Sequence, residues 1–109
     1  MAVATFSCVF AVLCSSAGLC EDKDFTLSVV YEPGVAIAEM AIGLAEPFPV
    51  AMTDAGLGPL VFHGGGGIFS PVLLTVQPSN GAALVSLHPG LLGVAYSGAG
   101  SCSRKDGRT

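Results

Sequence analysis

The side chains that could bind a metal ion or act as nucleophiles are few, and they lie far apart in this chain. Outside the first 17 residues, the candidate metal ligands are Cys20, His63, His88 and Cys102. A structural zinc site uses about four such side chains, usually as two pairs that are close in sequence. No two of these residues are close in sequence, so we expect no metal site and no other cofactor.

The segment from Val61 to Gly67 is the one stretch whose pattern carries known chemistry. It reads Val-Phe-His-Gly-Gly-Gly-Gly, and it resembles the His-Gly-Gly-Gly turn of lipases and esterases with the α/β-hydrolase fold. The resemblance implies that backbone N–H groups of this turn would help to form an oxyanion hole, which stabilises negative charge on a substrate oxygen. The residues concerned are His63, Gly64, Gly65 and Gly66.

The rest of the hydrolase pattern is absent from the sequence. That family also needs a Gly-x-Ser-x-Gly turn, followed by an acidic residue and a histidine. The nearest match is 95–99, where alanine replaces both glycines around Ser97 and no histidine follows. A phosphate-binding loop would need Gly-Lys-Ser/Thr after the glycines, and Ile68 follows them instead. We therefore expect no enzyme activity and interpret 64–67 as a loop, with a degenerate α/β-hydrolase fragment as the remote alternative.

Charge is scarce and unevenly distributed. The 109 residues include 15 Gly and 7 Pro, 51% are hydrophobic, and only 11% are charged, against about 25% in ordinary soluble domains. No Asp, Glu, Lys or Arg occurs between 55 and 103. Nucleic acids are bound by clustered Lys and Arg, so a chain of net charge −4 without such a cluster is not expected to bind DNA or RNA.

The first 20 residues resemble an export signal. They carry no charged side chain, and an apolar stretch at 9–13 is followed by the small residues Ser15, Ser16, Ala17 and Gly18. This order is typical of a secretory signal peptide, which we expect at 1–17 with cleavage after Ala17 or Gly18. About 20 apolar residues can also span a bilayer, so an uncleaved anchor is the alternative. A third interpretation is a buried element of a cytosolic fold.

Which cysteines remain to form disulfides depends on whether this leader is removed. Its removal would take away Cys8 and Cys14 and leave Cys20 and Cys102 near the two ends of the mature chain. In an oxidising compartment these two residues could form one disulfide, and two free thiols are the alternative.

The remaining sequence predicts mostly strands. Residues 25–31 alternate between apolar and polar side chains, as in a half-buried strand. The spacing of apolar residues over 35–46, between Pro33 and Pro47, predicts one short helix. Asn80-Gly81 is a strong hairpin signal. Strands are expected at 48–52, 59–63, 68–77, 82–88 and 91–96, and the last three predict a three-strand meander over 68–97.

These observations predict a small, mainly β, glycine-rich domain at 18–103 with one short helix and a basic tail at 104–109. A largely disordered or poorly packed chain is the alternative. Several strands are apolar on both faces and need cover, for which a partner protein or a membrane surface is expected. The predicted function is that of a small exported, non-enzymatic binding or interaction protein. The alternatives are a membrane-anchored protein with most of the chain outside the cytoplasm, and an unselected reading frame with no defined function.

Overall fold

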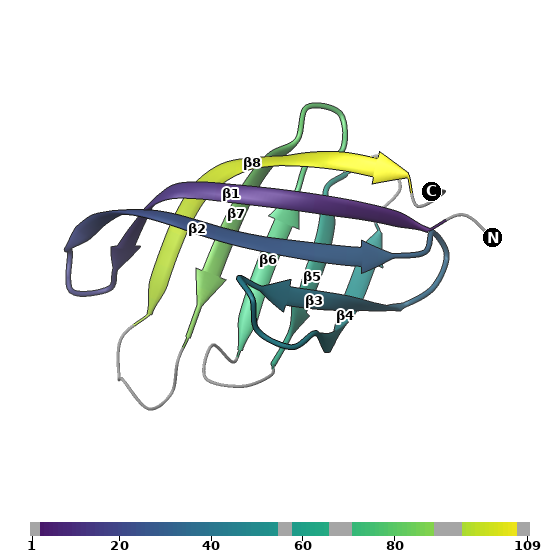
Figure 1. Cartoon of the computed structure of the whole chain (residues 1–109), viewed down its shortest axis with the longest axis horizontal. Helices are drawn as coiled ribbons and strands as arrows, with labels where there is room; N and C mark the ends of the chain where they lie inside the picture. The colour runs from purple at the N-terminus through teal and green to yellow at the C-terminus, as the bar shows by residue number, and fades with distance from the viewer. Residues whose placement is uncertain (1–2, 55–57, 66–70, 89–94, 107–109) are drawn as a thin grey trace.

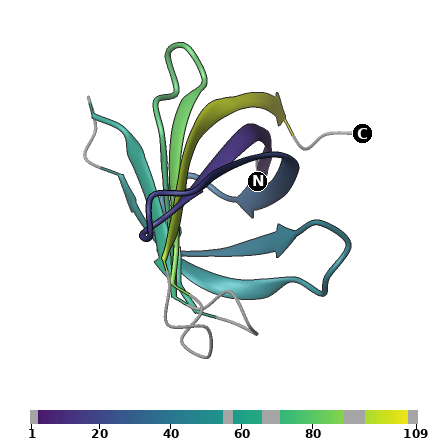
Figure 2. The same ribbon diagram turned by 90° about the vertical axis from the view of Figure 1, so that its left-hand side faces the viewer.

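The chain folds as a closed antiparallel barrel in which each strand pairs with the next one along the sequence. The computed structural model describes residues 3–54, 58–65, 71–88 and 95–106. The last strand pairs with the first and closes the barrel, as Figures 1 and 2 show from two directions. The strands are β1 (Ala4–Ser15), β2 (Cys20–Tyr31), β3 (Ile37–Ile42), β4 (Phe48–Asp54), β5 (Leu60–Gly64), β6 (Val72–Val76), β7 (Ala82–Leu87) and β8 (Tyr96–Asp106).

Alternation along each strand separates the core from the surface. In β2, Leu27, Val29 and Tyr31 are buried while Thr26 and Val30 are exposed. Successive side chains of a strand point to opposite faces, so one set fills the barrel and the other faces solvent. This strand confirms the half-buried strand predicted at 25–31.

The predicted β-rich single domain is confirmed, and it contains a meander of three consecutive strands, whose third strand lies at Tyr96–Asp106 instead of the predicted 91–96. Strands β6, β7 and β8 follow one another as antiparallel neighbours. The turn between β6 and β7 uses Gly81 at a φ of 77°, and the Gly81 N–H donates to the Gln77 carbonyl oxygen at 2.8 Å. Residues 89–94, which include most of the strand predicted at 91–96, lie outside the described residues. Strand β8 continues to Asp106, so Arg104 and Lys105 pair with β1 instead of beginning a tail.

The helix predicted over 35–46 is wrong. Residues 37–42 form β3, with Ala38, Met40 and Ile42 buried and Ile37 and Glu39 exposed. The same residues satisfy a period of two as well as the helical spacing, and pairing with β2 and β4 on both sides favours the strand. A turn precedes β3, in which the Val35 N–H donates to the Glu32 carbonyl oxygen at 3.0 Å and Gly34 has a φ of 86°.

The segment predicted as an export leader is the first strand of the barrel. Ala4, Phe6, Cys8 and Phe10 are buried, and β1 pairs with β2 on one side and with β8 on the other. The predicted cleavage sites, after Ala17 or Gly18, fall in the turn between β1 and β2. Nothing in the structure tests the cleavage itself, which stays a prediction.

Candidate functional site

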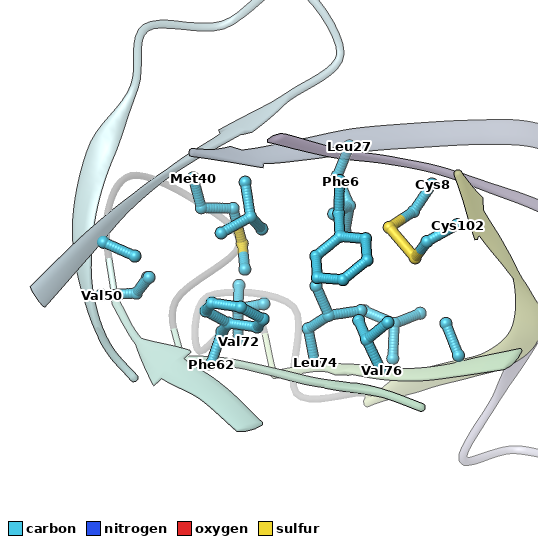
Figure 3. Close-up of a cluster of buried hydrophobic side chains, with 14 of the residues drawn as sticks. Phe6, Cys8, Leu27, Met40, Val50, Phe62, Val72, Leu74, Val76 and Cys102 are labelled. Carbon is cyan, nitrogen blue, oxygen red and sulfur yellow. A yellow bond between two sulfur atoms is a disulfide. The ribbon is translucent and has the colours of Figure 1, made fainter. Parts of the chain in front are cut away.

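The interior of the barrel is filled by the chain's own side chains. Phe6, Phe10, Met40 and Phe62 are among the largest fully buried residues, and Figure 3 shows several of these side chains meeting at the centre. The rings of Phe6 and Tyr31 stack with centroids 5.4 Å apart. No polar or charged side chain is buried in the described part of the chain. An eight-stranded barrel is just wide enough for side chains to fill it or for one small ligand, and here buried apolar side chains of the described strands occupy the centre.

Two disulfides join strands that are neighbours in the barrel. Cys8 on β1 is bonded to Cys102 on β8 inside the barrel, and Cys14 is bonded to Cys20 beside the turn between β1 and β2. The predicted Cys20–Cys102 bond is therefore not the one that forms in this chain. The prediction assumed that Cys8 and Cys14 are removed with the leader, whereas the register of β1 places each of them directly opposite a cysteine.

Glycine allows β1 and β8 to approach closely beside the Cys8–Cys102 bond. A Cβ atom at Gly98 would lie 2.7 Å from the Val12 carbonyl oxygen. A Cβ atom at Gly100 would collide with the Val9 carbonyl oxygen and would lie 2.6 Å from a ring carbon of Phe10. The register of β1 against β8 shifts between Val9 and Cys14, at this same place. The absence of side chains at both glycines lets the first strand close onto the last.

The residues of the hydrolase-like segment are not assembled into a catalytic group. His63 is exposed on β5, and the strand ends at Gly64. A Cβ atom at Gly64 would lie 3.2 Å from the Cα of Val50, so close packing against β4 accounts for this glycine. Gly65 follows the strand as an exposed residue, and Gly66 lies outside the described residues.

Ser97, the nearest match to a nucleophile, is also remote from His63. Ser97 lies on β8, and the cross-strand row between the two residues passes through Leu73 on β6 and Ser86 on β7. Two strands therefore separate the serine from the histidine.

The four candidate metal ligands are likewise not brought together. Cys20 and Cys102 belong to two different disulfides. His88 follows β7, where its backbone N–H donates to the Pro71 carbonyl oxygen at 3.0 Å. Within the described ranges, no group of three or more His, Cys, Asp or Glu side chains is arranged to hold a metal ion.

The outer surface of β5, β6, β7 and residues 97–101 of β8 carries no charged side chain, and we call it the uncharged face. Cross-strand register places its residues side by side on the outside of the barrel. They carry no carboxylate, ammonium or guanidinium group, and they are Val61, His63, Leu73, Thr75, Ala82, Leu84, Ser86, Ser97, Ala99 and Ser101. Leu84 is 61% exposed and Leu73 is 44% exposed, so large apolar side chains meet solvent here.

A hollow of about 410 Å³ lies beside Leu84 on this face. Its lining includes Thr75 of β6, Ala82 and Leu84 of β7, and Ala99 and Gly100 of β8. The side chains of Ala82 and Ala99 are small, so the surface is recessed next to the larger side chain of Leu84. Sequence analysis did not identify this site, although the charge-free run of 55–103 together with alternation along the strands was a signal for it.

The acidic residues lie on the other strands of the barrel. Glu21, Asp22 and Asp24 are exposed on β2, and Glu39 is exposed on β3. Glu32, Glu46 and Asp54 also lie between β2 and the end of β4, and only Asp106 of the described acidic residues is on β8. The negative charge of the protein is therefore concentrated away from the uncharged face.

Comparisons with protein-family models, with curated proteins and with solved structures each found no match to this chain. Among the described residues, no helix has the length and apolar character needed to cross a membrane.

Proposed function

We propose that this protein is a small, non-enzymatic interaction module that is exported and contacts its partner through the uncharged face. The observation that carries the proposal is the pair of disulfides that tie the first strand into a barrel with a filled interior. Intramolecular disulfides are typical of oxidising, extracellular-type compartments, where they stabilise small domains. Because buried apolar side chains of the described strands pack the centre of the barrel, we place the contact with a partner on the outer surface.

The uncharged face supports the interaction part of the proposal. Two exposed leucines lie among Ala, Ser and Thr side chains, so covering this face removes apolar area from water without removing any ion from water. Exposed apolar patches on soluble domains commonly mark sites of protein contact.

We further propose that the exported protein retains residues 4–15. Removal of residues 1–17 before folding and closure of this barrel exclude each other, because β1 supplies one cysteine to each disulfide. Without β1, strands β2 and β8 would each expose an unpaired edge, a feature that promotes aggregation. Retention also disfavours the membrane-anchored alternative, since residues that form a barrel strand cannot at the same time form a spanning helix.

The intact mass of the protein secreted by expressing cells tests export and retention together. We expect a full-length chain in the medium, with four cysteines that react with an alkylating reagent only after reduction. A chain that begins at Gly18 or Leu19, with two cysteines, would show that the leader is removed and that this barrel is not the mature form. Full-length protein with free thiols, found only inside the cell, would contradict export.

Hydroxyl-radical labelling tests the interaction surface. The protein in its native medium is compared with the purified protein, diluted until it sediments as a monomer. Leu84 should be labelled less in the medium, because a partner covers it. Leu44, which is fully exposed in the turn between β3 and β4, is the matched control and should be labelled equally in both. Equal labelling of Leu84 in both samples would contradict the proposed surface.

A further inference from the structure

We infer that the partner of the uncharged face is a second copy of this chain, in a two-fold symmetric dimer. The inference rests on the proposed interaction function and adds the identity of the partner. In a two-fold dimer the same surface is used by both copies, so a residue that protrudes from one copy must fit a hollow on the other. The uncharged face contains both features side by side.

Leu84 is the protruding residue, and the hollow beside it is the recess that would receive it. Leu84 is 61% exposed at the centre of β7, with Thr75 on one side and Ala99 on the other. The hollow of about 410 Å³ is lined largely by small or apolar residues and is large enough for a leucine side chain. When two copies face each other, Leu84 of each can enter the hollow of the other.

The distribution of charge favours a second copy over a charged partner. Each copy carries a net charge of −4, and its acidic residues lie on β2 to β4 and the turns between them, apart from Asp106 at the end of β8. Two copies that meet through β5 to β8 keep most of these carboxylates apart, whereas contacts through β2 to β4 would bring them together. The face itself offers a basic or acidic partner no ion pair, and the exposed Arg104 and Lys105 lie beyond it toward the end of β8.

The size of the face indicates a reversible dimer. Neighbouring strands lie about 4.8 Å apart and rise about 3.3 Å per residue. Four short strands therefore present a face of roughly 20 Å by 20 Å, or about 400 Å². This is smaller than the roughly 800 Å² that each partner buries in a stable complex of standard size. We therefore expect association at micromolar or higher concentrations, not a permanent dimer.

Sedimentation equilibrium of the purified, oxidised full-length chain tests the inference. We expect the average mass to rise from 10.9 kDa toward twice that value as the concentration increases. Leu84→Lys should raise the dimer dissociation constant by about 30-fold or more, the effect expected for a central interface residue. Ala99→Arg, which fills the hollow, should do the same. Leu44→Lys adds the same charge as Leu84→Lys on an exposed leucine away from the face, and should leave the constant unchanged.

Circular dichroism and thiol counting establish that each variant keeps its sheet and both disulfides, so that loss of the dimer is not loss of the fold.

The dependence of the dimer dissociation constant on salt supplies an independent measurement. A dimer through the uncharged face should not weaken as salt increases, because salt screens only the repulsion between the copies. The inference is overturned if the wild-type chain stays monomeric, or if Leu84→Lys and Leu44→Lys give the same dimer dissociation constant. It is also overturned if added salt dissociates the dimer. A monomer whose Leu84 is still protected in native medium would overturn the dimer alone and leave the proposed function standing.

Discussion

Cys8 and Cys102 lie directly opposite each other on β1 and β8 and are bonded through their sulfur atoms, although 94 residues separate them in the sequence. The bond therefore joins the first strand to the last and fastens the closure of the barrel covalently. Cys14 and Cys20 are only 6 residues apart and fasten a single hairpin. The two disulfides differ in the length of chain that they close and in their burial, and these differences lead to distinct predictions.

Removal of the Cys8–Cys102 bond should destabilise the protein more than removal of the other bond. In the chain-entropy model, a disulfide that closes a loop of this length stabilises by about 4.7 kcal/mol, and one that closes a loop of about 7 residues by about 2.4 kcal/mol. Urea unfolding of the paired variants Cys8→Ala/Cys102→Ala and Cys14→Ala/Cys20→Ala measures the two losses. Equal losses would show that loop length does not govern the contribution of these bonds.

The two disulfides should be reduced in a fixed order. Cys8 is 1% and Cys102 is 9% exposed, whereas Cys20 is exposed at the surface. A reductant must reach a sulfur atom, so Cys14–Cys20 should open first while Cys8–Cys102 persists until the barrel unfolds. Timed addition of a dithiol, followed by alkylation and peptide mass mapping, gives the order. Earlier labelling of Cys8 than of Cys20 would contradict the burial seen here.

Gly100→Ala should weaken the closure between β1 and β8. The new methyl group would collide with the Val9 carbonyl oxygen and with the Phe10 ring, and overpacking of this kind costs about 1–3 kcal/mol. Ser101→Ala, on the neighbouring exposed residue of the same strand, should change the free energy of unfolding by less than about 0.5 kcal/mol. Thermal and urea unfolding of both variants test the difference, and a Gly100→Ala protein as stable as the control would refute the close approach.

Phe62→Ala should be among the most damaging substitutions in the core. Phe62 is fully buried, and its ring packs against that of Tyr31 in an edge-to-face arrangement with centroids 5.8 Å apart. Truncation of a buried phenylalanine to alanine costs about 3–5 kcal/mol. Ile37→Ala removes a large apolar side chain that is 58% exposed on β3 and serves as the control, with an expected change of about 0.5 kcal/mol. Similar losses in the two variants would contradict the assignment of Phe62 to the core.

A chain that lacks residues 1–17 should fail to form the barrel. It loses β1, and Cys20 and Cys102 both lose the cysteines to which they are bonded. We expect poor chemical-shift dispersion in its NMR spectrum and self-association on gel filtration, because β2 and β8 become edges. A monomeric, well-dispersed truncated chain with a Cys20–Cys102 bond would instead support the cleaved leader predicted from the sequence.

The turn between β1 and β2 permits a further distinction in the mass measurement. Ala17 and Gly18 lie within the loop that the Cys14–Cys20 bond closes, and the Ser16 N–H donates to the Ala95 carbonyl oxygen at 2.7 Å. Cleavage there after folding would leave β1 attached through both disulfides. Such a protein would be heavier than the intact chain by the mass of one water molecule, and reduction would separate it into two fragments. Cleavage before folding would instead remove the leader altogether.

Local sequence determined the features that depend on neighbouring residues. The alternation over 25–31 predicts the buried residues of β2, because one face of a strand must avoid water. Gly34 and Gly81 mark turns, because glycine adopts a positive φ without steric cost. The absence of charge over 55–103 left no Asp, Glu, Lys or Arg for the uncharged face.

Tertiary structure decided what depends on contacts between distant segments. The spacing over 35–46 suits a helix or a strand, and hydrogen bonds to β2 and β4 select the strand. Four cysteines allow three pairings, and only the register of β1 against β2 and β8 selects Cys8–Cys102 and Cys14–Cys20. The apolar leader-like segment became a barrel strand because neighbours on both sides satisfy its backbone and cover its buried face, and no local pattern reveals those neighbours.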